Sequence, residues 1–97
     1  MSAPAAPSVT DNAERRRFEL EADGQLAVLN YRREEDVLVL THTEVPPELE
    51  GQGVGSALVR GVLEQARRDG QRVMPLCGFV HAWVRRHPEF ADVVAER

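Results

Sequence analysis

The fold is decided by one stretch of the sequence, Glu50-Gly51-Gln52-Gly53-Val54-Gly55-Ser56. Its glycines alternate in a segment that follows an apolar, strand-like run and leads directly into an amphipathic helical pattern. Glycine has no Cβ, so such a loop lets backbone amides approach a ligand closely. A helix that begins there adds unpaired N–H groups and the positive end of its dipole, which favour a phosphate. The stretch therefore predicts a phosphate-binding loop, and the alternative is that the glycines serve an ordinary turn.

Alternating apolar and polar residues predict antiparallel strands before this loop. Residues 17–22 and 26–31 both alternate, and Asp23-Gly24 between them is a strong hairpin signal. A polar turn is expected over residues 32–36. The next run, residues 37–45, is apolar on both faces at its start, as in a central strand, and the two prolines that follow end it.

Helical periodicity begins after the loop. It covers residues 54–69, and Gly70 is the expected end of that helix. Residues 72–76 then predict a strand parallel to the preceding one, because a helix crosses between the two. A second helix is expected over residues 79–86, and a last short helix begins at Pro88. The pattern predicts a compact α/β (α+β) fold in which an antiparallel meander leads into a parallel pair, with helices packed on the sheet.

Composition limits the class of protein. Residues 1–13 have no periodicity and predict a disordered tail, which leaves residues 14–97 as a single domain. No apolar run approaches the roughly 18 residues that span a bilayer, and no signal peptide is recognisable, so we expect a cytoplasmic protein without a membrane partner. The net charge of −4 argues against nucleic acid as a partner. All 12 basic residues are arginine, a bias typical of bacteria with GC-rich genomes.

Two common phosphate loops do not fit the stretch. The Walker A loop ends in Gly-Lys-Ser/Thr, and the sequence contains no lysine. The dinucleotide fingerprint Gly-x-Gly-x-x-Gly requires a sixth glycine, but that position is Ser56 when counted from Gly51 and Leu58 when counted from Gly53. A nucleotide-binding loop of either type is therefore excluded.

The run from Val45 to Leu58 resembles the pyrophosphate-binding motif of the GNAT superfamily of N-acetyltransferases, Arg/Gln-x-x-Gly-x-Gly/Ala, between a central strand and a long helix. Two later segments, Pro75-Leu76-Cys77-Gly78 and His87-Pro88-Glu89-Phe90, resemble the short, cysteine-containing branch of that superfamily. The resemblance covers most of the chain from Arg17 onward. It implies a GNAT-like fold whose parallel strands splay at the cofactor site, and acetyl-coenzyme A as the cofactor.

The resemblance also implies which residues hold the cofactor. Glu44 and Val45 would pair with the pantetheine arm through their main chains. Glu50 departs from the motif, since it places an acid where the family has arginine or glutamine, and its side chain is expected to point away from the anionic ligand. The pyrophosphate would be held by the backbone amides of Gln52, Gly53, Val54, Gly55 and Ser56.

Three side chains are candidates for chemistry. Cys77 would lie near the thioester sulfur, where it is either a nucleophile activated by a helix N-terminus or a small buried apolar residue. His42 and Glu44 are two residues apart and so share a strand face, where either could act as general base or align a water, or the histidine could simply be hydrogen-bonded on a half-exposed sheet face. No spacing of histidines and carboxylates fits a metal site, so we expect no metal.

The function implied is an acetyl-coenzyme A-dependent N-acetyltransferase that acts on a small-molecule amine or a protein amino group. The short chain implies an acceptor groove that is open or completed by a partner subunit, as in a homodimer. The alternatives are a non-catalytic acyl-coenzyme A-binding module and an interaction domain that has lost the ligand. Glu50 favours the binding module, as does Trp83, because it occupies the helix in which many GNATs carry an acidic tyrosine.

Overall fold

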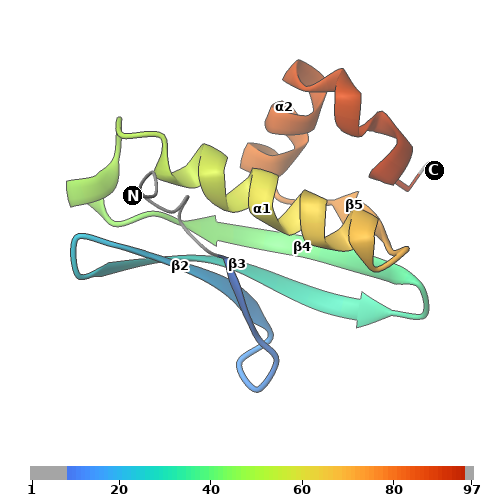
Figure 1. Ribbon diagram of the computed structural model, residues 1–97, viewed down its shortest axis with the longest axis horizontal. Helices are drawn as coiled ribbons and strands as arrows, with labels where there is room; N and C mark the ends of the chain where they lie inside the picture. The colour runs from blue at the N-terminus through green and yellow to red at the C-terminus, as the bar shows by residue number, and fades with distance from the viewer. Residues whose placement is uncertain (1–8, 96–97) are drawn as a thin grey trace, which may run out of the picture.

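The computed structural model describes residues 9–95 and contains a five-stranded sheet whose strands follow one another in chain order, with the helices over it (Figure 1). The first four strands pair antiparallel: β1 (Thr10–Asn12), β2 (Arg17–Ala22), β3 (Gln25–Glu34) and β4 (Val37–Glu44). Strand β5 (Arg72–Pro75) pairs parallel to β4. The predicted meander followed by a parallel pair is confirmed.

Two helices and two 3-10 turns complete the fold. Helix α1 (Val54–Arg68) crosses between β4 and β5, and it ends before Gly70, whose φ of +71° only glycine adopts readily. Helix α2 (Gly78–Arg86) follows β5. The 3-10 helix η1 (Pro47–Leu49) precedes the glycine loop, and η2 (Pro88–Val93) stands where the last short helix was expected. No helix of the described residues has the length and apolar content needed to cross a membrane.

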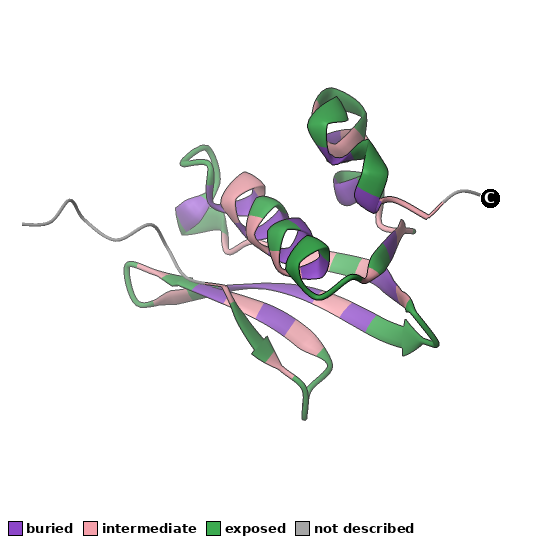
Figure 2. Cartoon of the chain, turned by 45° about the vertical axis from the view of Figure 1, so that its right-hand side comes forward, coloured by how far each residue is buried: buried purple, intermediate pink, exposed green. Residues whose placement is uncertain are grey.

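The core lies between α1 and the sheet (Figure 2). Apolar side chains of α1 face the sheet at helical spacing, among them Leu58, Val62 and Ala66, each at most 2% exposed. Strand β3 contributes Leu29 and Tyr31, which lie two residues apart and so share the face that the core covers. Burial of this stripe against the sheet fixes α1, and with it the loop from which the helix begins.

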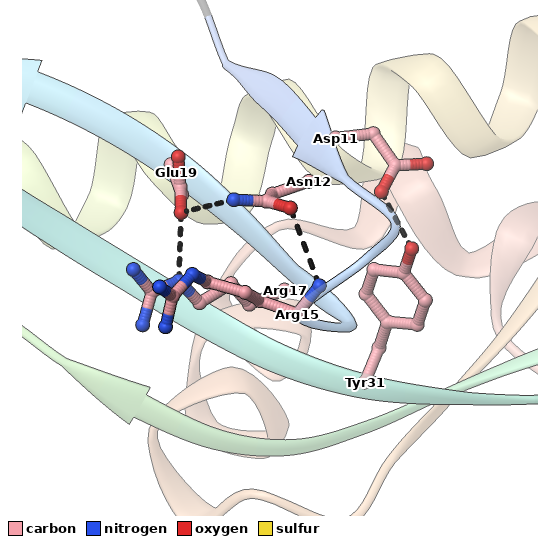
Figure 3. Close-up of polar contacts among 6 residues, drawn as sticks. All are labelled: Asp11, Asn12, Arg15, Arg17, Glu19 and Tyr31. Atoms are coloured by element: carbon pink, nitrogen blue, oxygen red, sulfur yellow. Dashed lines mark hydrogen bonds and ion pairs between the residues drawn. The ribbon is translucent and has the colours of Figure 1, made fainter.

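The first strand begins within the segment that was predicted to be disordered. Residues 1–8 lie outside the described range, but Thr10–Asn12 form strand β1, paired with residues 17–19 of β2. Polar side chains attach this strand, which an apolar periodicity cannot reveal: Asn12 Nδ2 donates to Glu19 Oε2 at 2.9 Å, and the Tyr31 hydroxyl donates to Asp11 Oδ1 (Figure 3). The prediction of disorder is therefore wrong for the segment 10–12.

Strand β3 is also longer than predicted. The polar turn expected over residues 32–36 is confined to Glu35 and Asp36, because Arg32, Arg33 and Glu34 continue the ladder with β4. Their side chains are exposed, so their polarity does not oppose the strand. Main-chain pairing with an apolar partner strand decides the conformation here.

Candidate functional site

The glycine loop adopts a conformation that requires glycine at two positions. Gly51 has a φ of +84°, and Gly53, which caps the N-terminus of α1, has a φ of +79°. Side chains other than glycine rarely adopt such angles. The two glycines turn the chain from η1 into the first turn of α1.

This geometry leaves open N–H groups at the start of α1. In the described part of the chain, the amides of Gly53, Val54, Gly55 and Ser56 have no backbone acceptor; the first helical bond runs from the Ala57 amide to the Gly53 carbonyl at 2.9 Å. The amide of Gln52, which we also expected to be open, instead donates to the Leu49 carbonyl oxygen at 3.3 Å. The open backbone amides therefore begin at Gly53, one residue later than the predicted start at Gln52.

A bulge in β4 determines which side chains face the helices. Asn30 pairs with His42, but the next residue, Tyr31, pairs with Leu40, so Thr41 is an extra residue in β4. Because one inserted residue reverses the alternation, Thr43 lies on the same face as Leu40, the face covered by α1.

His42 and Glu44 consequently lie on the other face of the sheet. Their side chains are near each other, with His42 Nε2 3.4 Å from Glu44 Oε2, and both are more than half exposed, at 61% and 69%. Their shared face was predicted correctly. The structure does not bring these side chains into the groove described below.

Strand β4 extends beyond the end of its pairing with β5. Their pairing ends with Leu40 and Pro75, after which the Leu76 and Cys77 amides both donate to the Leu40 carbonyl oxygen at 3.0 Å. Beyond this point β4 continues to Glu44 with no neighbouring strand on its β5 side among the described residues. The splay expected from the resemblance is present.

A groove of about 640 Å³ lies beside the loop. Trp83 of α2 holds one wall of the groove in place, because its Nε1 donates a hydrogen bond to Ser56 Oγ at 2.7 Å. Gly55 packs closely against α2 as well, since a Cβ there would lie 3.0 Å from the ring of Phe79. The groove is lined by Thr43, Val45, Leu49, Glu50, Gly51, Gly53, Val54, Gly55, Ser56, Phe79, Trp83, Arg86 and His87.

Cys77 lies next to this groove, at the N-cap of α2. Its Sγ is 3.2 Å from Oγ1 of the groove residue Thr43. Burial raises the pKa of the Cys77 thiol. Hydrogen bonding with Thr43 and with the amides of Val80 and Phe79 lowers it by more than burial raises it, so that the pKa lies below its ordinary value. The thiol is thus more readily ionised than a free cysteine.

Several groove residues were not predicted as site residues. Thr43 reaches the groove only because of the bulge at Thr41, which no sequence signal reveals. His87 caps the C-terminus of α2 and also lines the groove, together with Arg86. Helical spacing from Phe79 and Trp83 could have indicated this face.

Comparison with known proteins agrees with this architecture. The model of the GCN5-related N-acetyl-transferase family matches residues 17–93. A search of curated proteins found no match. Among solved structures, a GCN5-like protein from Staphylococcus aureus, described as a presumed N-acetyltransferase and determined by NMR in solution, is 26% identical, with a TM-score of 0.72 over 97% of this chain and 93% of that chain.

Proposed function

The chain belongs to the GCN5-related N-acetyltransferase family, and we propose that it transfers the acetyl group of acetyl-coenzyme A to an amine of a small molecule or a protein. The observation that carries the proposal is the set of open amides at the start of α1, which lies in the wall of a groove beside the splayed end of β4. Such a helix start favours a phosphate through both its N–H groups and its dipole.

The residues of the groove fit the parts of this cofactor, which supplies a thioester-activated acetyl group when bound. Amides of residues 53–56 would hold the pyrophosphate, with Gly51 and Gly53 maintaining the loop conformation that leaves them open. The main chains of Glu44 and Val45 would pair with the pantetheine arm along the free edge of β4. The Gln52 amide, occupied by its bond to Leu49, would contribute only after that bond opens.

Transfer to an amine requires a group that accepts its proton. We propose His42 or Glu44 for this role. Both side chains lie at the splayed end of β4 but on the face away from the groove, so the proton would reach either of them through a water at that end of the strand. A pH–rate profile of the H42A and E44A variants tests this role: loss of one limb of the profile supports it, and an unchanged profile excludes it.

Cys77 is the proposed nucleophile for a two-step transfer. Its thiolate would form a bond to the acetyl carbon while the bond to the coenzyme A sulfur breaks, and that sulfur would leave with the electron pair and take up a proton. The acceptor amine would then take the acetyl group from Cys77 and release the thiolate. The lowered pKa of Cys77 and its place at a helix N-terminus support this route.

The second candidate is a non-catalytic acyl-coenzyme A-binding module. It is favoured by Trp83, whose indole cannot act as a general acid although it lines the groove, and by the acidic Glu50 in the lining.

Calorimetry with acetyl-coenzyme A tests both candidates, since absence of binding contradicts each. Incubation with labelled acetyl-coenzyme A and a panel of amines then separates them: acetylated amine supports the transferase, and binding without transfer supports the module. An acetyl group on Cys77 in the intact protein, together with loss of transfer in C77A, supports the two-step route, whereas full transfer by C77A excludes it.

A further inference from the structure

Arg86 and Glu50 carry opposite charges in the same groove. Among the described residues that line it, Arg86 is the only arginine and Glu50 the only residue with a carboxylate. Glu50 stands where the motif of the resembling family has arginine or glutamine, so the loop itself offers no cationic side chain to a phosphate. Arg86, on α2, brings a permanent positive charge to the groove from another element.

The charge of Arg86 is not compensated within the described chain. Other arginines nearby are engaged: Arg67 forms a 2.6 Å ion pair with Asp92, and Arg60 lies 3.8 Å from Glu89. No carboxylate of the described residues lies within 4.0 Å of Arg86. Its guanidinium is therefore available for a bidentate bond to a phosphate, the anion for which its planar geometry is suited.

The end of α2 is held in place beside the loop. The Trp83–Ser56 hydrogen bond joins α2 to the first turn of α1. The ring of His87 stacks on that of Trp83, with centroids 3.7 Å apart and planes 9° from parallel. Its Nδ1 lies 2.8 Å from the Trp83 carbonyl oxygen, which can only accept, so Nδ1 carries the proton of this hydrogen bond.

We propose that Arg86 binds the phosphates of coenzyme A and takes the place of the cation that the loop lacks at Glu50. The amides of residues 53–56 contribute directional donors without a full charge, and Arg86 contributes the charge. The inference rests on the proposed function, because it concerns the ligand of the same groove.

Titration calorimetry with coenzyme A tests the proposal. R86Q is expected to weaken binding about tenfold, the loss typical of one charge-assisted hydrogen bond. R85Q is the matched control, since Arg85 is the neighbouring exposed arginine of α2 and does not line the groove; it should change affinity by less than about twofold. E50R should restore affinity when combined with R86Q, because it returns the cation to the loop.

Salt and a truncated ligand distinguish a charge contact from a structural effect. The affinity of R86Q should fall less steeply with salt than that of wild type, because one screened attraction is absent. Equal losses with coenzyme A and dephospho-coenzyme A assign Arg86 to the pyrophosphate, and a loss with coenzyme A alone assigns it to the 3′-phosphate.

If wild type binds coenzyme A and the affinities of R86Q and R85Q cannot be distinguished, the inference is overturned and the proposed function stands. A weakened R86Q that keeps the wild-type salt dependence and is not restored by E50R also overturns it, since the arginine would then act through the fold. Failure of wild type to bind coenzyme A overturns the proposed function, and the inference with it.

Discussion

The indole Nε1 of Trp83 donates a 2.7 Å hydrogen bond to Oγ of Ser56, and this bond joins the middle of α2 to the first turn of α1. The backbone amide of Ser56 is one of the open N–H groups at the start of that helix. One residue thus anchors the groove wall with its side chain and presents a donor with its main chain.

Replacement of Trp83 by phenylalanine should therefore weaken both the fold and ligand binding. Loss of the hydrogen bond should cost about 1 kcal/mol of unfolding free energy, in addition to the cost of the space left by the smaller ring. Urea denaturation of W83F, S56A and the double variant forms a cycle that separates the energy of the hydrogen bond from the cost of the lost packing. Coupling of about 1 kcal/mol is expected, and strictly additive losses would show that the bond contributes nothing to stability.

Gly53 should be required for ligand binding as well as for stability. G53A places a side chain at φ +79°, which should cost about 1–2 kcal/mol of unfolding free energy, and should reduce acetyl-coenzyme A affinity measured by calorimetry. Gly70 provides the control, since it has a φ of +71° and open space around it but lies at the far end of α1. G70A should be destabilised to a similar extent and bind normally; a G53A variant that binds like G70A contradicts the role of the loop.

The loop and the periodic elements could be predicted because their signals are local. Glycines at Gly51 and Gly53 meet a backbone requirement at the same positions, and the stripe of α1 reflects burial of one helix face. The bulge at Thr41 could not be predicted. It depends on the register between β3 and β4, which is set by packing across the whole pair, and it decides that Thr43 rather than His42 reaches the groove.

Strand β1 escaped prediction for a different physical reason. Its attachment relies on the hydrogen bond that Asp11 accepts from Tyr31 and on the one that Asn12 donates to Glu19, and a short polar segment is equally compatible with disorder. The groove residues of α2 were missed for a third reason. The sequence shows that they share one helical face, but it does not show which surface that face meets, because that is a tertiary property.

Gly61 should be essential for docking the N-terminal segment on α1. A Cβ at Gly61 would overlap the side chain of Val9, whose carbonyl oxygen accepts a 2.8 Å hydrogen bond from Gln65 Nε2. G61A gains up to about 1 kcal/mol of helix propensity, but overpacking costs about 1–3 kcal/mol, so we expect net destabilisation in thermal unfolding. The V9A/G61A double variant should recover the loss, and a G61A variant more stable than wild type would contradict the observed packing.

Glu19 should stabilise the fold more near neutral pH than in acid. Hydrogen bonds from Arg17 and then Asn12 lower its pKa below the ordinary value of 4.5 (Figure 3). A carboxyl whose pKa is depressed on folding contributes stability above its unfolded pKa, and that contribution is lost as the pH falls through the folded value. Urea denaturation should therefore show E19Q less stable than wild type near neutral pH and similar to it in strong acid. A stability difference that is independent of pH would refute the linkage.

Thr43 should control the ionisation of Cys77, because its hydroxyl lies 3.2 Å from the thiol sulfur. With the pKa of Cys77 held below its ordinary value of 9.0, the rate of alkylation by iodoacetamide should rise with pH and level off at a lower pH than for a free cysteine, since only the thiolate reacts. T43V removes the hydroxyl at nearly constant volume, which raises the pKa and should move this profile to higher pH. T41V is the matched control, because the Thr41 hydroxyl bonds to the Asn30 carbonyl oxygen instead. A T43V profile that coincides with that of T41V would show that the amides at the start of α2, and not the hydroxyl, set the reactivity of Cys77.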